Sequence, residues 1–146
     1  MAKPRSLNSG FMELRISFIT LAVGDVARSR VFDVDGLGWK PMFENDEVLM
    51  LPVGRHLMLS LWSIEGFSAE VGHAPTKGIA PLTLAHNCRT EAEVDSVLEL
   101  AASIGAETSP AIRREWGGHS GYFADPDGFR WEIAMNPGPT GDYVLP

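Results

Sequence analysis

The strongest constraint on the fold is a turn near the end of the chain, Asp125-Pro126-Asp127-Gly128, which separates two segments of alternating pattern. Pro126 presets one backbone angle, aspartate side chains bond to nearby backbone, and Gly128 tolerates a positive φ. Residues 120–124 and 129–135 on either side favour strands. Because side chains alternate across a strand, Glu132 shares a face with Arg130 and Ala134, opposite Trp131, Ile133 and Met135. The sequence therefore predicts a hairpin in which a carboxylate points away from the larger apolar residues.

The same order of elements, strand, helix and three strands, is predicted twice along the chain. The first copy spans residues 14–62, and its helix at 26–34 is predicted to begin after the N-cap Asp25. The second copy spans residues 79–137, and its helix begins at the capping box Thr90-Glu-Ala-Glu93 and stops at Gly105. A local match supports the repeat, since Thr20-Leu21-Ala22 recurs as Thr83-Leu84-Ala85 in the strand before each helix.

The predicted strands of the first copy are 14–23, 39–43, 48–53 and 56–62, and those of the second are 79–88, 107–114 and the two hairpin strands. Residues 1–13 are interpreted as a leader without regular structure. Residues 63–78 form a linker with one or two helical turns, and residues 138–146 form a tail that packs along the surface.

These elements predict an α+β fold in which two βαβββ modules form an open-sided β-barrel, with the helices covering the outer faces. The inner faces would line a cleft. The residues predicted to line it are Phe18, Thr20, Met58, Ser60, Trp62, Pro81, Thr83, Ala85, Tyr122, Arg130, Glu132 and Ala134. Trp116 joins them because Gly117 and Gly118 beside it would let a ligand approach the backbone. The aromatic residues either stack on a flat ligand or simply fill the barrel.

Composition narrows the possible partners and location. The chain has 146 residues and a net charge of −7, which argues against nucleic acid and anionic membranes as partners. Cys88 is the single cysteine, so no internal disulfide can form, and a reducing, cytoplasmic location is expected. The sequence contains no phosphate-binding loop and no nucleophile elbow.

Three motifs carry a resemblance to a known family: Phe18-Ile-Thr-Leu-Ala-Val-Gly-Asp25, Val31-Phe-Asp-Val-Asp-Gly-Leu-Gly-Trp39 and Asp125-Pro-Asp-Gly-Phe-Arg-Trp-Glu132. The chain resembles the vicinal oxygen chelate superfamily, also called the glyoxalase, bleomycin-resistance and extradiol dioxygenase superfamily. The resemblance implies paired βαβββ modules, often a homodimer, and in catalytic members a divalent metal that acts as a Lewis acid.

The family's metal-ligand positions, carried over by motif, fall on Phe18, Met58, Pro81 and Glu132. Only Glu132 has a side chain that binds metal, and transition metals in such sites need about three protein ligands. The resemblance therefore implies a binder of an unidentified small molecule without a metal cofactor. One alternative is an enzyme of this superfamily, a lyase, isomerase or dioxygenase, with Glu132 as general base or with a displaced metal site of His56, His119 and Glu132. A structural role for Glu132, paired with Arg130 or a nearby donor, stays open, as does a scaffold with a closed cleft.

Overall fold

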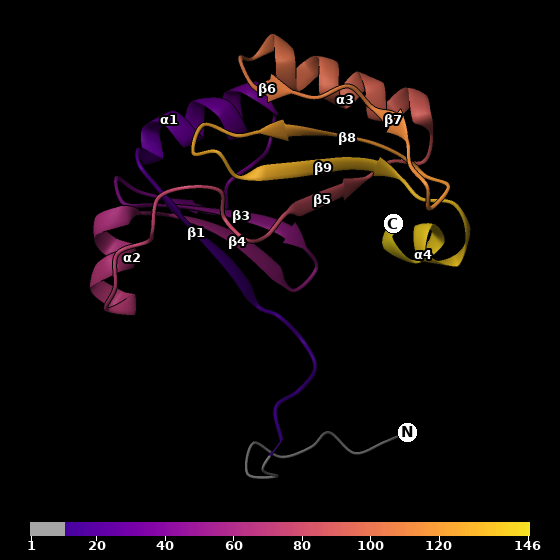
Figure 1. The fold of residues 1–146 in the computed structure, drawn as a ribbon. Helices are drawn as coiled ribbons and strands as arrows, with labels where there is room; N and C mark the ends of the chain where they lie inside the picture. Colours follow the sequence, from indigo (N-terminus) through magenta and orange to yellow (C-terminus); the bar gives the residue numbers. More distant parts are fainter. Residues whose placement is uncertain (1–10) are drawn as a thin grey trace.

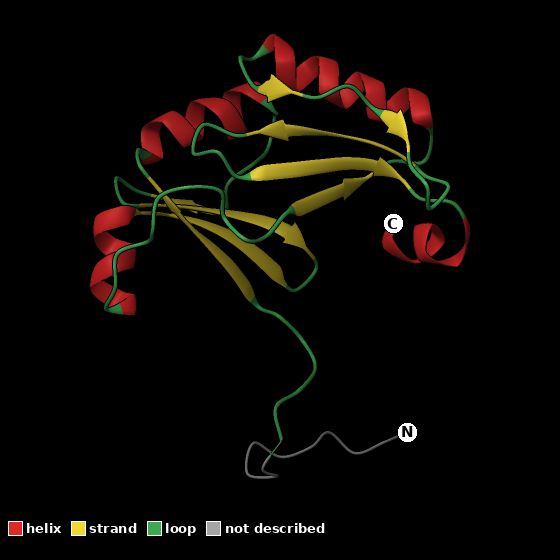
Figure 2. Ribbon diagram, viewed as in Figure 1, coloured by secondary structure: helices red, strands yellow, loops and turns green. Residues whose placement is uncertain are grey.

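The computed structural model of the chain describes residues 11–146, so most of the predicted leader lies outside the described residues. Its strands form two separate sheets (Figures 1 and 2). The first sheet has the order β1-β4-β3-β2, with β1 at Phe18–Val23, β2 at Phe43–Glu44, β3 at Val48–Gly54 and β4 at Leu57–Ser63. The second has the order β5-β9-β8-β6, with β5 at Leu84–Asn87, β6 at Glu107–Thr108, β8 at His119–Ala124 and β9 at Arg130–Met135; β7 at Ile112–Arg113 also pairs with β8.

Helices lie against both sheets. In the first module, α1 at Val26–Arg30 continues into a π-helix, η1, at Val31–Gly36; in the second, α3 spans Glu91–Ser103. The linker carries α2 at Ile64–Val71, and the chain ends with α4 at Gly138–Val144. None of the helices among residues 11–146 has the length and apolar character needed to cross a bilayer.

The predicted helix caps are confirmed. The Asp25 side chain accepts hydrogen bonds from the amides of Ala27 and Arg28, and Thr90 accepts one from the amide of Glu93 at 3.1 Å. The Glu93 carboxylate reaches back to the amide of Arg89 at 2.9 Å, one residue earlier than the capping box predicts. Gly105, at φ +97°, ends α3 as expected.

Several predicted strands and the tail differ from the structure. The segments 14–23 and 79–88 become strands only at Phe18 and Leu84, and the strand predicted at 39–43 is reduced to β2. The strand predicted at 107–114 is split into β6 and β7 around Pro110, which has no amide to donate to a ladder. The tail forms α4, which has a proline in its first turn, where the missing amide costs nothing.

Two apolar clusters form the core, one in each module. In the first, Leu21, Leu49, Leu59 and Leu61 are buried with Val26 of α1. In the second, Phe123 and Ile133 are buried with Val94, Leu98 and Ala101 of α3. The modules meet through two aromatic pairs, Trp39 with Trp131 at 5.3 Å between ring centroids and Phe32 with Phe123 at 6.0 Å. Phe32 of the first module is itself part of the second cluster, and Trp131 packs against both clusters. The module contact thus uses the helix-facing sides of both sheets.

The predicted turn at Asp125–Gly128 also links the modules. Asp125 Oδ1 accepts from the amides of Asp127 and Phe129, both at 3.0 Å, which closes the turn. Asp127 Oδ1 accepts from the amide of Gly24 at 2.7 Å and pairs with Arg28 at 3.0 Å. The second module therefore holds the start of α1 in the first through one carboxylate.

A further carboxyl group, that of Asp33 on η1, is buried near this junction. Its residue is 7% exposed, and its carboxyl makes no hydrogen bond within residues 11–146. Burial, together with the nearby negative charges of Asp125 and Asp127, raises the pKa of Asp33 to about 7. Between pH about 4 and about 7 the folded protein thus holds a proton here that the unfolded chain releases.

We expect Asp33→Asn to stabilise the protein around neutral pH. Because the folded pKa is raised, the wild type loses stability as pH rises from about 4 to about 7, and the asparagine avoids a penalty of at most about 4 kcal/mol. Below pH about 4 the carboxyl is protonated in both states, so the gain should vanish. Denaturant unfolding at several pH values measures this difference.

The control is Asp35→Asn, because Asp35 is an exposed neighbour on the same helix that pairs with Arg30. It should show no comparable pH-dependent gain. An Asp33→Asn gain of equal size at pH 4 and pH 8 would contradict the ionisation argument.

Candidate functional site

The predicted lining residues of the first module share one face of the first sheet. The parallel pairing of β1 with β4 sets Phe18 opposite Met58 and Thr20 opposite Ser60, with Trp62 one step further on β4. Ser60 is buried, whereas Phe18 is 54% exposed. The ladder to β3 and β2 extends this face through Met50 and Phe43, which the sequence interpretation missed. We call this surface the Phe18 face.

Trp62 keeps its place on the Phe18 face because α2 passes close to it. A Cβ built on Gly66 of α2 would lie 2.3 Å from the indole nitrogen of Trp62, so only glycine fits there. The linker helix, predicted only as one or two turns, is therefore part of the wall behind Trp62.

The predicted residues of the second module share one face of the second sheet. Ala85 on β5, Glu132 on β9 and Tyr122 on β8 are direct neighbours across the three strands. The Tyr122 hydroxyl donates a hydrogen bond to Glu132 Oε2 at 2.9 Å. This bond, with partial burial and the negative charge of Glu132, raises the pKa of Tyr122. The donor to Glu132 is thus a tyrosine, and Arg130 is exposed at the end of the hairpin. We call this surface the Glu132 face.

Arg114 belongs to the Glu132 face, although the sequence interpretation did not include it. Its Nε donates to Ser120 Oγ at 2.9 Å, and a terminal nitrogen donates to the Ser120 carbonyl at 3.0 Å. The guanidinium lies over the Tyr122 ring, 5.9 Å from the centroid. Ser120 is fully buried, so it fixes the guanidinium rigidly. The alternating strand pattern could not place Arg114, because the strand is interrupted at Pro110 and Arg114 follows its second part, β7.

Trp116 lies between β7 and β8 and is half-exposed. A Cβ on Gly118 would overlap the Trp116 ring, so the glycine lets the indole fold back onto its own turn. Pro81 and Thr83 lie in the exposed segment before β5.

One chain does not bring the two faces into one cavity. The modules meet through the opposite, helix-facing sides of their sheets, and no ladder among residues 11–146 joins the sheets. None of the principal cavities in the described chain is lined by Phe18 or Glu132. The two predicted walls of the cleft therefore lie on separate surfaces of the single chain.

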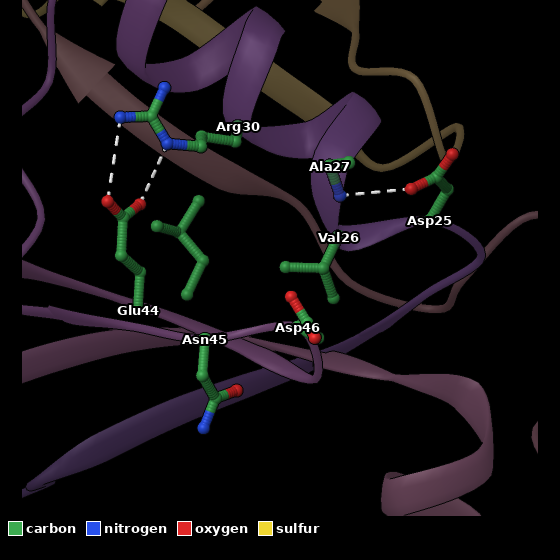
Figure 3. A pocket seen from close by; sticks show the side chains of 8 residues that line it. Asp25, Val26, Ala27, Arg30, Glu44, Asn45 and Asp46 are labelled. Carbon is green, nitrogen blue, oxygen red and sulfur yellow. Dashed lines mark hydrogen bonds and ion pairs between the residues drawn. The ribbon is translucent and has the colours of Figure 1, made fainter.

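Figure 3 shows one of these cavities, of about 450 Å³, between α1 and the β2–β3 turn. Three of its four charged residues, Asp25, Arg30 and Glu44, are engaged with each other or with backbone. Arg30 pairs with Glu44 at 2.9 Å, and Asp25 caps α1 (Figure 3). The Asn45 side chain accepts from the amides of Glu47 and Val48. These bonds stabilise the start of α1 and the β2–β3 turn, so the residues around the hollow have a structural role.

The residues present do not fit the divalent metal that the family resemblance implies. Phe18 and Met58 face each other in register, and neither Phe18 nor Pro81 has a donor atom in its side chain. The displaced site of His56, His119 and Glu132 is not assembled either, because His119 pairs with Asp95 at 3.2 Å and His56 lies in the β3–β4 turn. Within residues 11–146, no three His, Cys, Asp or Glu side chains gather in a way that suits a metal ion.

Comparison with known proteins agrees with the family resemblance of the sequence motifs. The family model described as Glyoxalase/Bleomycin resistance protein/Dioxygenase superfamily matches residues 15–133. A glyoxalase-related enzyme from Fulvimarina pelagi is similar in structure, with a TM-score of 0.79 and 38% identity over 85% of this chain and 89% of that one. No protein among the curated ones matches this chain.

Two more distant structures share the fold. A glyoxalase/bleomycin resistance protein/dioxygenase from Nocardioides has a TM-score of 0.71 and 21% identity, over 90% of this chain and 92% of that one. A lactoylglutathione lyase from Agrobacterium tumefaciens has a TM-score of 0.68 and 20% identity, over 84% and 93%. At these identities the likeness shows the fold alone.

We expect Glu132→Gln to lower the pKa of Tyr122 toward its ordinary value, because the substitution removes the negative charge that the hydroxyl bonds to. The chain has two tyrosines, so a Tyr143→Phe background leaves Tyr122 as the single titrating phenol. Ultraviolet absorbance of tyrosinate against pH measures it. Glu107→Gln, an exposed change on β6, is the control. Identical Tyr122 titration with and without Glu132 would contradict the geometry of this face.

Proposed function

The chain belongs to the Glyoxalase/Bleomycin resistance protein/Dioxygenase superfamily, and from this membership we propose that it binds a small organic molecule without using a divalent metal. The observation that carries the proposal is the donor set. Three of the four positions expected to bind metal hold a phenyl ring, a thioether and a pyrrolidine, and the fourth, Glu132, is engaged by Tyr122. A single carboxylate does not retain a transition metal at such a site.

We further propose that two copies of the chain complete the binding cleft. The Phe18 face is apolar yet open, since Phe18 and Phe43 are both about half exposed. Met12, Leu14 and Ile16, in the segment before β1, are exposed as well. An open apolar surface of this kind favours burial against a partner. In a homodimer, the Phe18 face of one copy would lie against the Glu132 face of the other.

The two faces offer complementary chemistry to a ligand. The Phe18 face supplies aromatic and thioether groups with the hydroxyls of Thr20 and Ser60, and the Glu132 face supplies Tyr122, Glu132 and the fixed guanidinium of Arg114. A flat apolar molecule with a polar or ionised group fits this division, because aromatic walls and a few placed polar groups are typical of ligand sites.

An enzyme is the second candidate, and the bond between Tyr122 and Glu132 favours it. A carboxylate that accepts from a phenol can take a proton from a bound substrate while the phenol shares the change in charge. This hypothesis requires that Glu132→Gln abolish a turnover. An unchanged rate in that variant would reject it.

A cytoplasmic location is part of the same proposal. It is supported by Cys88, the single cysteine, which is buried and unpaired in the described chain. The net charge of −7 supports a small molecule rather than nucleic acid as partner.

We expect the dialysed protein to hold no stoichiometric transition metal, and added Zn²⁺ or Ni²⁺ to leave its melting temperature unchanged. Elemental analysis and thermal unfolding measure the two quantities. Glu132→Gln should behave like the wild type in both. Stoichiometric metal that survives dialysis and is lost in Glu132→Gln would overturn the proposal.

We expect the protein to be a dimer in sedimentation experiments, and Phe18→Glu to shift it toward the monomer, because a carboxylate would be placed in an apolar interface. The control is Leu100→Glu, an equally drastic change at an exposed position of α3 outside both faces. A wild-type monomer, or equal effects of the two substitutions, would count against the shared cleft.

A further inference from the structure

A second apolar cavity lies at the junction of the two modules, and its floor is on the side of the first sheet opposite to the Phe18 face. Its volume is about 660 Å³, which is within the range of small-molecule sites. Its floor is the row of Ile19, Leu59 and Leu51, which are direct neighbours across β1, β4 and β3. We call it the seam cavity.

The walls of the seam cavity are aromatic and aliphatic. Trp39 follows η1 and Trp131 is the second residue of β9, and their rings are tilted at 55° with centroids 5.3 Å apart. The remaining apolar lining consists of Pro52, Val53, Leu57, Leu84 and Ala85. Trp131 is held in place because its indole nitrogen donates to Asp125 Oδ2 at 3.3 Å. The hollow is therefore bounded by fixed rings and strands.

None of the polar side chains that line this cavity is acidic. Its lining contains Lys40, His86 and the hydroxyl-bearing Thr83, and no carboxylate. Lys40 and His86 are exposed, and neither forms an ion pair within residues 11–146. In a chain with a net charge of −7, a rim with basic groups and without acidic ones is a local exception. Such a rim favours an anionic group over a neutral or cationic one.

We propose that the seam cavity is a second ligand site that binds small apolar carboxylates. The hydrocarbon body of the ligand lies against Trp39, Trp131 and the floor of the cavity. Its carboxylate lies at the rim with Lys40 and His86.

The leucines of the floor and Trp131 lie opposite the Phe18 and Glu132 faces, because alternate residues of a strand point to opposite sides of its sheet. This site is therefore distinct from the cleft of the proposed function, although Ala85 of the Glu132 face and Pro52, the register partner of Met58, also line it. The proposal of a second site does not depend on the proposed cleft.

The chain offers a direct test, because its four tryptophans divide between the two sites. Trp39 and Trp131 line the seam cavity, whereas Trp62 belongs to the Phe18 face and Trp116 to the loop before β8. Naphthalene-2-carboxylate is titrated into the full chain while the indole N–H signals are followed by NMR. The neutral alcohol 2-naphthylmethanol is titrated in parallel. We expect the signals of Trp39 and Trp131 to shift, and the acid to bind more tightly than the alcohol.

Lys40→Gln is the informative variant, since Lys40 is exposed and its loss should not affect folding. It should weaken binding of the acid by about fivefold, the scale of one exposed ion pair, and leave binding of the alcohol unchanged. Lys77→Gln, an exposed change in the linker, is the matched control and should leave both affinities unchanged.

Four results would overturn the proposal. The first is no shift of Trp39 or Trp131 at millimolar acid. The second is a shift confined to Trp62 and Trp116, which would place the probe in the cleft instead. The third is equal affinity for acid and alcohol, which would make the cavity an apolar hollow only. The fourth is an equal effect of Lys40→Gln and Lys77→Gln on binding of the acid.

Discussion

The structure depends on the turn at Asp125–Gly128, whose two carboxylates have different tasks. Asp125 closes its own turn and accepts from the Trp131 indole, so it orients the ring that joins both apolar clusters. Asp127 reaches about a hundred residues back in the chain, to the Gly24 amide and Arg28, and holds the start of α1. A charge-assisted contact and an aromatic contact thus fix the relative position of the modules. The arrangement also destabilises the folded state when Asp33 ionises, because burial and these negative charges raise the pKa of its carboxyl.

This mode of joining determines which surfaces of the two sheets stay open. Because the modules are held by the helix-facing sides of their sheets, the Phe18 and Glu132 faces are left open, and the seam cavity forms where neither α1 nor α3 covers the junction. The two surfaces also differ in chemistry. The Phe18 and Glu132 faces together offer aromatic rings, a tyrosine–carboxylate pair and a fixed guanidinium. The seam cavity offers tryptophans and a basic rim.

Local signals in the sequence predicted the elements well. Asp25, Thr90 and Gly105 act as caps through contacts with neighbours a few residues away, and strand alternation places Tyr122 beside Glu132. The failures have a physical cause in more distant contacts. The helix α4 is rich in helix-breaking residues, yet Gly141 is required because a side chain there would overlap the Asn136 carbonyl. Arg114 was missed because its place depends on the buried Ser120 across a broken strand. No local pattern reveals that Asp127 meets Arg28, or which faces of the two sheets meet.

We propose that the open faces of two copies together form a cleft that holds an organic ligand and no metal ion. A crystal structure of the full chain, grown with Zn²⁺ and analysed at the zinc absorption edge, would show both features at once. We expect the Phe18 face of one copy to lie against the Glu132 face of another, with no anomalous peak between them. A zinc ion bound there by three side chains would contradict it.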